Sequence, residues 1–182
     1  MKWSEKIKAP YEVAFKLAPA RGVRARLDPV VARLVRDCTF DSAVYIVFSN
    51  NAPQYVGQSG SVRDRFIAGV DKREKGYVWP EAGGDFKVYF FEVPLQDHFR
   101  KAVEMEVMLL LRLHTGFWPI ESSGAHPFHQ LKSSSEINMA STRAREMLDM
   151  LFQRQPKFAA SSKESSDLLA AFDGAEAILC RR

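Results

Sequence analysis

The sequence has little cysteine and no long apolar run, and each absence narrows the class of protein. The 182 residues contain two cysteines, Cys38 and Cys180, which lie far apart and in no paired motif. A disulfide framework or a structural zinc site is therefore not expected. No window approaches the roughly 20 apolar residues that a membrane-spanning helix needs. The first residues lack the apolar stretch and cleavage site of a secretory signal, so we expect a cytoplasmic, intracellular protein.

The sequence also has no large excess of either charge, since it contains 26 Lys and Arg and 22 Asp and Glu, for a net charge of +4. The excess is uneven, because residues 1–38 hold nine Lys and Arg against four Asp and Glu, which leaves 17 against 18 elsewhere. A basic segment attracts nucleic-acid phosphates, but a solvated helix face has the same composition. With 46% hydrophobic residues, the composition is that of a globular protein.

The residue pattern predicts short strands in the middle of the chain. Residues 42–48 (SAVYIVF) and 54–58 (QYVGQ) are rich in β-branched and aromatic side chains, and turn-forming residues separate them at 49–53. This pattern is typical of an antiparallel hairpin. Residues 85–93 (DFKVYFFEV) predict a third strand.

Helix-start signals surround these strands, with Asp28-Pro29 as a cap and first helical residue and Ser133 with Glu136 as a capping box. One predicted helix begins at Pro29. Four others cover about 61–70, 97–114, 134–154 and 167–179. We therefore expect an α/β (α+β) fold, a three-stranded antiparallel sheet flanked by helices in the order β-β-α-β-α. The core spans residues 41–125, with a basic helical N-terminal extension at 1–40 and a helical C-terminal extension at 126–182.

Two tripeptides in the hairpin form the most informative motif. Nine residues separate Ala43-Val44-Tyr45 from Tyr55-Val56-Gly57, and Arg65 lies six positions beyond Ser59. In spacing, residue type and context, residues 42–121 resemble the GIY-YIG endonuclease family. The resemblance implies hydrolysis of DNA phosphodiester bonds with one Mg²⁺ or Mn²⁺ ion, in double-stranded or branched DNA.

The resemblance also implies roles for the hairpin residues. Tyr45 accepts a proton from the attacking water or orients that water, and Tyr55 supports the site. Gly57 keeps the sheet surface open for the substrate backbone, because glycine has no side chain to block a close approach. Gln58 and Ser59 continue the motif and are candidate substrate-binding residues. A single buried tyrosine, taken alone, is more often a core residue with a hydrogen-bond partner.

Arg65 corresponds to the catalytic arginine of that family. Its neighbours on one face of the predicted helix are small or apolar, namely Ser61, Val62, Ala68 and Gly69. Because no carboxylate is among them, the guanidinium is available to bind a phosphate with two parallel hydrogen bonds.

Two glutamates compete for the role of metal ligand. Glu104 and Glu106 point about 200° apart on a helix, so one of them faces the site. Glu104 has Arg100 and Lys101 beside it, which indicates a solvated face with surface ion pairs. Glu106 has apolar neighbours, and a carboxylate among apolar side chains is costly unless it is protonated, paired or bound to a metal. We therefore expect Glu106 to hold the Mg²⁺ or Mn²⁺.

The sequence departs from the family pattern at two positions. Gly69 stands where a histidine is frequent, and Glu121 where an asparagine often closes the domain. Lys87 on the third strand is a candidate to replace part of their function. These departures leave a second hypothesis open, a catalytically weakened module that binds nucleic acid or assembles with a protein partner. The helical extensions are candidate surfaces for such a partner or for a homodimer.

Overall fold

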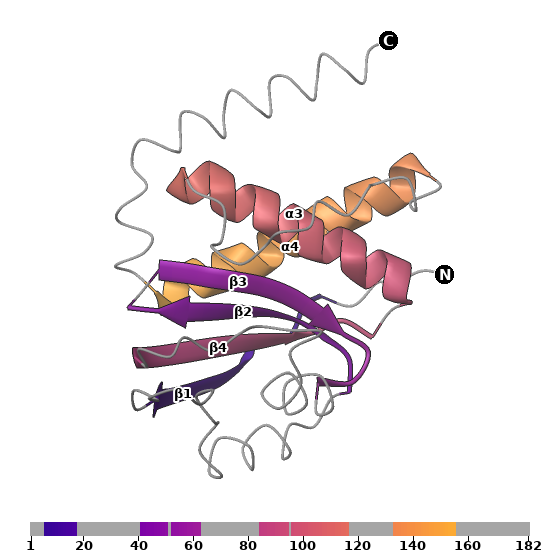
Figure 1. Ribbon diagram of the computed structural model, residues 1–182. Helices are drawn as coiled ribbons and strands as arrows, with labels where there is room; N and C mark the ends of the chain where they lie inside the picture. Colours follow the sequence, from indigo (N-terminus) through magenta and orange to yellow (C-terminus); the bar gives the residue numbers. More distant parts are fainter. Residues whose placement is uncertain are drawn as a thin grey trace, which may run out of the picture.

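A four-stranded antiparallel sheet and the helices on one of its faces form the described part of the chain (Figure 1). The computed structural model describes residues 6–17, 41–50, 52–62, 84–94, 96–116 and 133–155. The strands are β1 (Tyr11–Leu17), β2 (Ala43–Ser49), β3 (Ala52–Ser59) and β4 (Gly84–Glu92), in the spatial order β1-β4-β2-β3. The helices are α3 (Asp97–Thr115) and α4 (Ser134–Arg154).

Strands β2 and β3 form the predicted hairpin, which is confirmed. Asn50 has a φ of 50°, a left-handed conformation that asparagine tolerates better than most residues and that suits a tight turn. Both strands extend closer to the turn than the sequence predicted. The pairing register of β2 with β3 shifts between Val47 and Phe48, near the turn. In the regular part of the pairing, farther from the turn, Tyr45 lies opposite Gly57.

The N-terminal segment corrects the predicted sheet, which has four strands rather than three. Residues 11–17, expected to be part of a helical extension, form β1 and pair with β4 from Tyr11↔Phe90 to Leu17↔Gly84. The physical reason is visible in YEVAFKL, which alternates between the two faces with a period of two. The helices predicted after Pro29, across 61–70 and at 167–179 lie outside the described residues or almost entirely so.

The other two predicted helices are confirmed. α3 ends where Gly116 adopts a φ of 76° and donates its N–H to the carbonyl of Arg112, the left-handed termination that glycine favours. α4 begins where the Ser133 hydroxyl accepts a hydrogen bond from the Glu136 N–H at 3.3 Å. α4 packs on α3 and contributes buried side chains to the main core, so this part of the C-terminal region belongs to the fold.

Alternation along the strands separates two sheet faces. The face toward the helices carries the main core, including Ile46, Phe48, Tyr89 and Phe91. The buried Tyr89 hydroxyl accepts a hydrogen bond from Gln155 Nε2 at 2.9 Å, and burial is the main cause that raises the pKa of Tyr89. The residues in between point to the opposite face, which is rich in aromatic side chains: Tyr11, Phe15, Tyr45, Tyr55, Phe86 and Phe90.

Candidate functional site

Tyr45 and Tyr55 lie side by side on the sheet face opposite the helices. Their ring centroids are 5.9 Å apart with an interplanar angle of 40°, and the Tyr45 ring also packs on Phe90 at 5.7 Å. Tyr45 is only 3% exposed, whereas Tyr55 is half-buried. The hairpin register therefore brings together the two tyrosines that the sequence motif singles out.

Gly57 is the position that allows this packing. A Cβ atom there would lie 2.5 Å from Tyr55 Cε1 and 2.6 and 2.7 Å from Tyr45 Cζ and Oη. The Tyr45 ring thus extends across Gly57, and because β3 is an outer strand of the described sheet, the hydroxyl points toward that edge. The expectation that Gly57 leaves open surface is wrong, since the tyrosine rings occupy the space that a side chain would fill.

We expect Gly57→Ala to lower the free energy of unfolding by about 1–3 kcal/mol, the usual cost of overpacking. It should also change the near-ultraviolet circular dichroism, because both tyrosine rings must move. Gly116→Ala is the control, because its positive φ costs about 1–2 kcal/mol but the new Cβ meets no atom within 4 Å. An unchanged tyrosine spectrum in Gly57→Ala would contradict the packing described above.

The three other candidate substrate-binding residues are engaged within the protein. Gln58 points to the helix face, where its amide bonds to Arg100 and Asp97. The Ser59 hydroxyl donates to the Ser61 carbonyl at 2.6 Å and accepts from the Ser61 N–H at 3.0 Å. Lys87 pairs across the sheet with Phe48 and therefore lies on the face opposite Tyr45.

Lys87 accordingly does not stand in for the missing histidine beside Tyr45. Its Nζ lies 3.8 Å from Glu12 Oε1 on the neighbouring strand. The sequence placed Lys87 on the correct strand, but the alternation of side chains sends it away from the tyrosines.

The two glutamates of α3 are buried in the reverse of the expected order. Glu104 is 9% exposed and counts among the buried charged residues, whereas Glu106 is half-buried. The prediction was wrong because cations beside a carboxylate do not by themselves indicate a solvated face, and Arg100 is itself buried at 8% exposure. A buried cation beside a carboxylate indicates a polar cluster inside the protein rather than a surface face.

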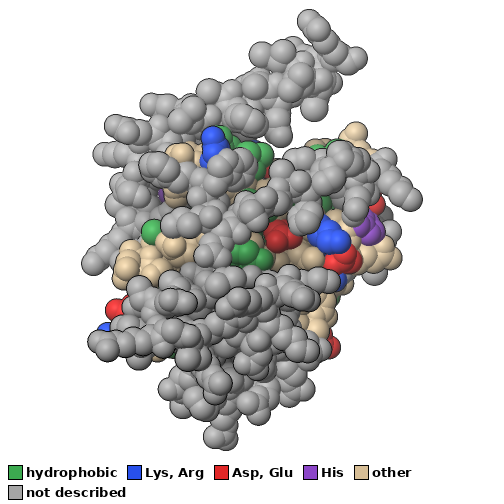
Figure 2. Space-filling view, in the orientation of Figure 1, with side chains coloured by type: hydrophobic (Ala, Val, Ile, Leu, Met, Phe, Trp, Pro, Cys, Tyr) green, Lys and Arg blue, Asp and Glu red, His purple; other side chains and the backbone are tan. Residues whose placement is uncertain are grey.

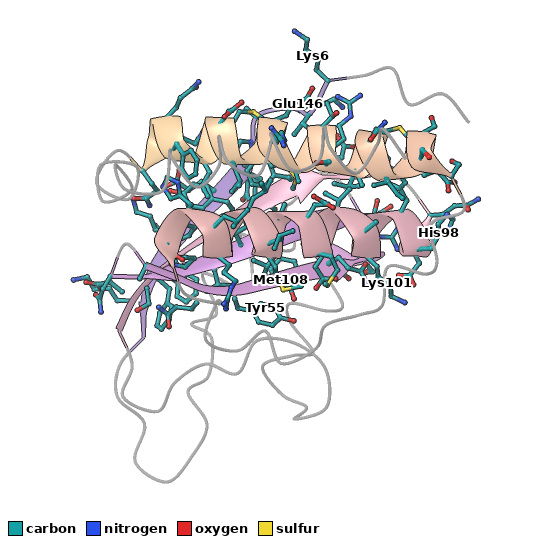
Figure 3. All side chains as sticks on the ribbon, turned by 90° about the horizontal axis from the view of Figure 1, so that it is seen from above. Lys6, Tyr55, His98, Lys101, Met108 and Glu146 are labelled. Carbon is teal, nitrogen blue, oxygen red and sulfur yellow. The ribbon has the colours of Figure 1, made fainter. Side chains whose placement is uncertain are left out.

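Glu104 shares one face of α3 with Lys101 and Met108. Figure 3 places Lys101, Met108 and Tyr55 on the same side of α3, with α4 on the other side. Glu104 is three residues after Lys101 and four before Met108, so the helical repeat puts all three on one face. Glu106 is turned about 200° from Glu104, toward the side of α4.

Asp97, Arg100 and Lys101 form a charged cluster at the start of α3. Lys101 Nζ lies 2.6 Å from Asp97 Oδ2, and Arg100 Nη2 lies 3.4 Å from Asp97 Oδ1. Figure 2 shows acidic and basic side chains side by side at the right of the molecule. The first turns of α3 lie in this place in Figure 1. This cluster was not predicted from the sequence, although the spacing of 97, 100 and 101 places the three residues on neighbouring helix positions.

The hydrogen bond from Lys101 is the main cause that holds the pKa of Asp97 below its usual value. Burial opposes this effect, while the charge of Lys101, the Gln58 amide and the charge of Arg100 reinforce it. The stabilisation is therefore complete above the pKa of an unfolded aspartate, about 3.9, and is lost as the pH falls through the lower pKa of the folded state.

We expect the stability difference between wild type and Asp97→Asn to shrink as the pH is lowered from about 6 toward the pKa of folded Asp97. Thermal unfolding of both proteins across this range measures the difference. A difference that stays constant with pH would show that the charge of Asp97 does not contribute to folding.

Several sequence-based candidates lie outside the described residues, among them Arg65, Gly69 and Glu121. Within the described ranges, no group of three or more His, Cys, Asp or Glu side chains is arranged to hold a metal ion. A Mg²⁺ ion does not require such a group, because it keeps several waters and is often bound through one or two carboxylates. None of the helices in the described ranges is long and apolar enough to cross a membrane.

Comparison with protein-family models, with curated proteins and with solved structures found no significant match to this chain.

Proposed function

We propose that the protein is a divalent-metal-dependent endonuclease of the GIY-YIG type that hydrolyses phosphodiester bonds in DNA. The observation that carries the proposal is the placement of the Tyr45 hydroxyl across Gly57, at the outer edge of β3. Buried Glu104 supplies a carboxylate on α3, the helix that packs on β3. A phenol can act as a proton acceptor and a carboxylate can bind a divalent metal ion, so the two groups are compatible with metal-assisted phosphodiester hydrolysis.

In this proposal Tyr45 accepts the proton of the attacking water or orients that water. Tyr55 packs against the Tyr45 ring and restricts its position. Arg65 binds the scissile phosphate, a role that rests on the sequence motif alone. The bound Mg²⁺ or Mn²⁺ supplies positive charge that stabilises the phosphate and the leaving oxygen.

Glu104 replaces Glu106 as the preferred metal-binding residue. A metal ion bound to a carboxylate that is removed from water offsets part of the cost of burying its charge. Burial now favours Glu104, which is 9% exposed on the helix that packs on β3. Glu106 remains the residue that the sequence motif favours, so both are tested.

The activity is tested with supercoiled plasmid in the presence of Mg²⁺ or Mn²⁺, with EDTA as the negative control. We expect nicked and linear DNA from the wild type and a large loss with Arg65→Ala. Equal nicking by the wild type and by Arg65→Ala would indicate a contaminating nuclease and would sink the proposal. Binding of DNA without cleavage at any metal concentration would favour the non-catalytic module instead.

The choice between the glutamates is a separate prediction. Glu104→Gln keeps the size of the side chain and removes its charge, so we expect the Mn²⁺ concentration for half-maximal cleavage to rise by at least about tenfold. Glu106→Gln is the matched control two residues away and is expected to change it little. A rise with Glu106→Gln alone would restore the assignment made from the sequence.

A further inference from the structure

We propose that Arg100 is a positioning residue, which fixes α3 to the end of β3 and thereby holds Glu104 at the edge where Tyr45 and Tyr55 lie. This inference rests on the proposed function, since it concerns the geometry of that same site. Arg100 itself has no assigned contact with substrate or metal.

Three hydrogen bonds link Gln58, Asp97 and Arg100 into a closed network. Arg100 Nε donates to Gln58 Oε1 at 3.2 Å, and Gln58 Nε2 donates to Asp97 Oδ1 at 3.2 Å. Arg100 Nη2 completes the network with Asp97 Oδ1 at 3.4 Å. Gln58 belongs to β3 and the two charged residues belong to α3, so the network connects the strand directly to the helix. We call these three residues the Arg100 network.

Gly60 adds a steric constraint to the same contact. A Cβ atom at Gly60 would lie 3.0 Å from Arg100 Nη2, a distance that forces the guanidinium to give way. Gly57 and Gly60 therefore both make room for a neighbouring side chain, Gly57 for the tyrosine rings and Gly60 for the guanidinium. The segment from Gly57 to Gly60 therefore contacts the tyrosine rings at Gly57 and α3 at Gly60.

The position of Arg100 on α3 makes the network relevant to the carboxylate. Arg100 and Glu104 are four residues apart, about one helical turn and 6 Å along the axis. A rigid helix that shifts along or away from β3 carries Glu104 with it, while Tyr45 and Tyr55 stay with the sheet. Misplacement of catalytic groups by about 1 Å can cost about 10²-fold in rate, so the anchoring of α3 matters for the site.

A matched control separates positioning from a general loss of stability. Arg143 on α4 is also 8% exposed, and it pairs with Glu146 three residues later at 2.7 Å, just as Arg100 pairs with Asp97 three residues earlier. Arg143→Met thus removes a comparably buried, ion-paired arginine that belongs to α4 and pairs within α4.

The experiment compares the full-length wild type with Arg100→Met, Gly60→Ala and Arg143→Met. For each protein, plasmid cleavage is measured as a function of Mn²⁺, direct Mn²⁺ binding is measured by electron paramagnetic resonance, and thermal unfolding is recorded. We expect Arg100→Met to raise the Mn²⁺ concentration for half-maximal cleavage by about 10- to 100-fold. Gly60→Ala should change it in the same direction, because the guanidinium is displaced but not removed.

Arg143→Met is expected to lower thermal stability without changing the Mn²⁺ requirement. If Arg100→Met and Arg143→Met lose stability equally and both keep the wild-type Mn²⁺ requirement, the positioning role is overturned while the proposed function stands. If Arg100→Met does not fold, Gly60→Ala decides the question by the same readout. If the wild type neither binds Mn²⁺ nor cleaves DNA, the proposed function fails, and the positioning role fails with it.

Discussion

Tyr45→Phe is expected to reduce metal-dependent DNA cleavage by about 10²- to 10⁴-fold, the usual contribution of a group that transfers a proton in the transition state. The substitution removes the hydroxyl and leaves the ring. Ring packing on Tyr55 and Phe90 should therefore be retained, and DNA affinity should change little. Single-turnover cleavage of a defined duplex at saturating metal measures the chemical step directly.

Tyr11→Phe is the matched control for this loss. Tyr11 lies on the same sheet face and packs on the same neighbour, Phe90, at a centroid distance of 6.5 Å. Tyr11→Phe also removes one phenolic hydroxyl, but from β1, which is separated from β2 by β4. Full activity in Tyr45→Phe, or an equal loss in both variants, would show that the Tyr45 hydroxyl takes no part in the chemistry.

Phe91→Ala is expected to lower the free energy of unfolding by about 3–5 kcal/mol, the range for large aromatic residues truncated in a core. Phe91 is fully buried on β4, within the core that the sheet forms with α3 and α4. A loss of this size is a large part of the 5–15 kcal/mol that holds a typical domain folded. Urea denaturation with circular dichroism measures the change.

Ile137→Ala serves as the comparison, because Ile137 on α4 is 44% exposed. A surface substitution of this kind usually changes stability by no more than about 0.5 kcal/mol. A small effect of Phe91→Ala, close to that of Ile137→Ala, would mean that the sheet and helices do not share one core in solution.

The sequence predicted those elements whose signals are local. The turn at Asn50, the cap at Ser133 and the termination at Gly116 each depend on residues within a few positions. β1 was missed because its partner, β4, lies far along the chain. No local pattern states whether an alternating segment will find a strand to pair with.

The residues of the candidate site likewise fall into those that local sequence predicts and those that depend on packing between distant elements. Tyr45 and Gly57 could be brought together from the sequence, because a hairpin register fixes which residues face each other. The burial of Glu104 could not, since it depends on how α3 lies against β3. The sequence predicted a surface cation at Arg100, whereas its guanidinium bonds to Gln58 and lies beside Gly60, which only the packing of α3 on β3 determines.

The strand order also has a consequence for how the chain folds. β4 lies between β1 and β2, so it is the strand on which both long-range pairings depend. The β2–β3 hairpin closes a short loop and can form early, whereas β1 must wait until β4 is in place. Contacts of such high sequence separation slow folding, and β1 is therefore expected to acquire its hydrogen-exchange protection after the hairpin.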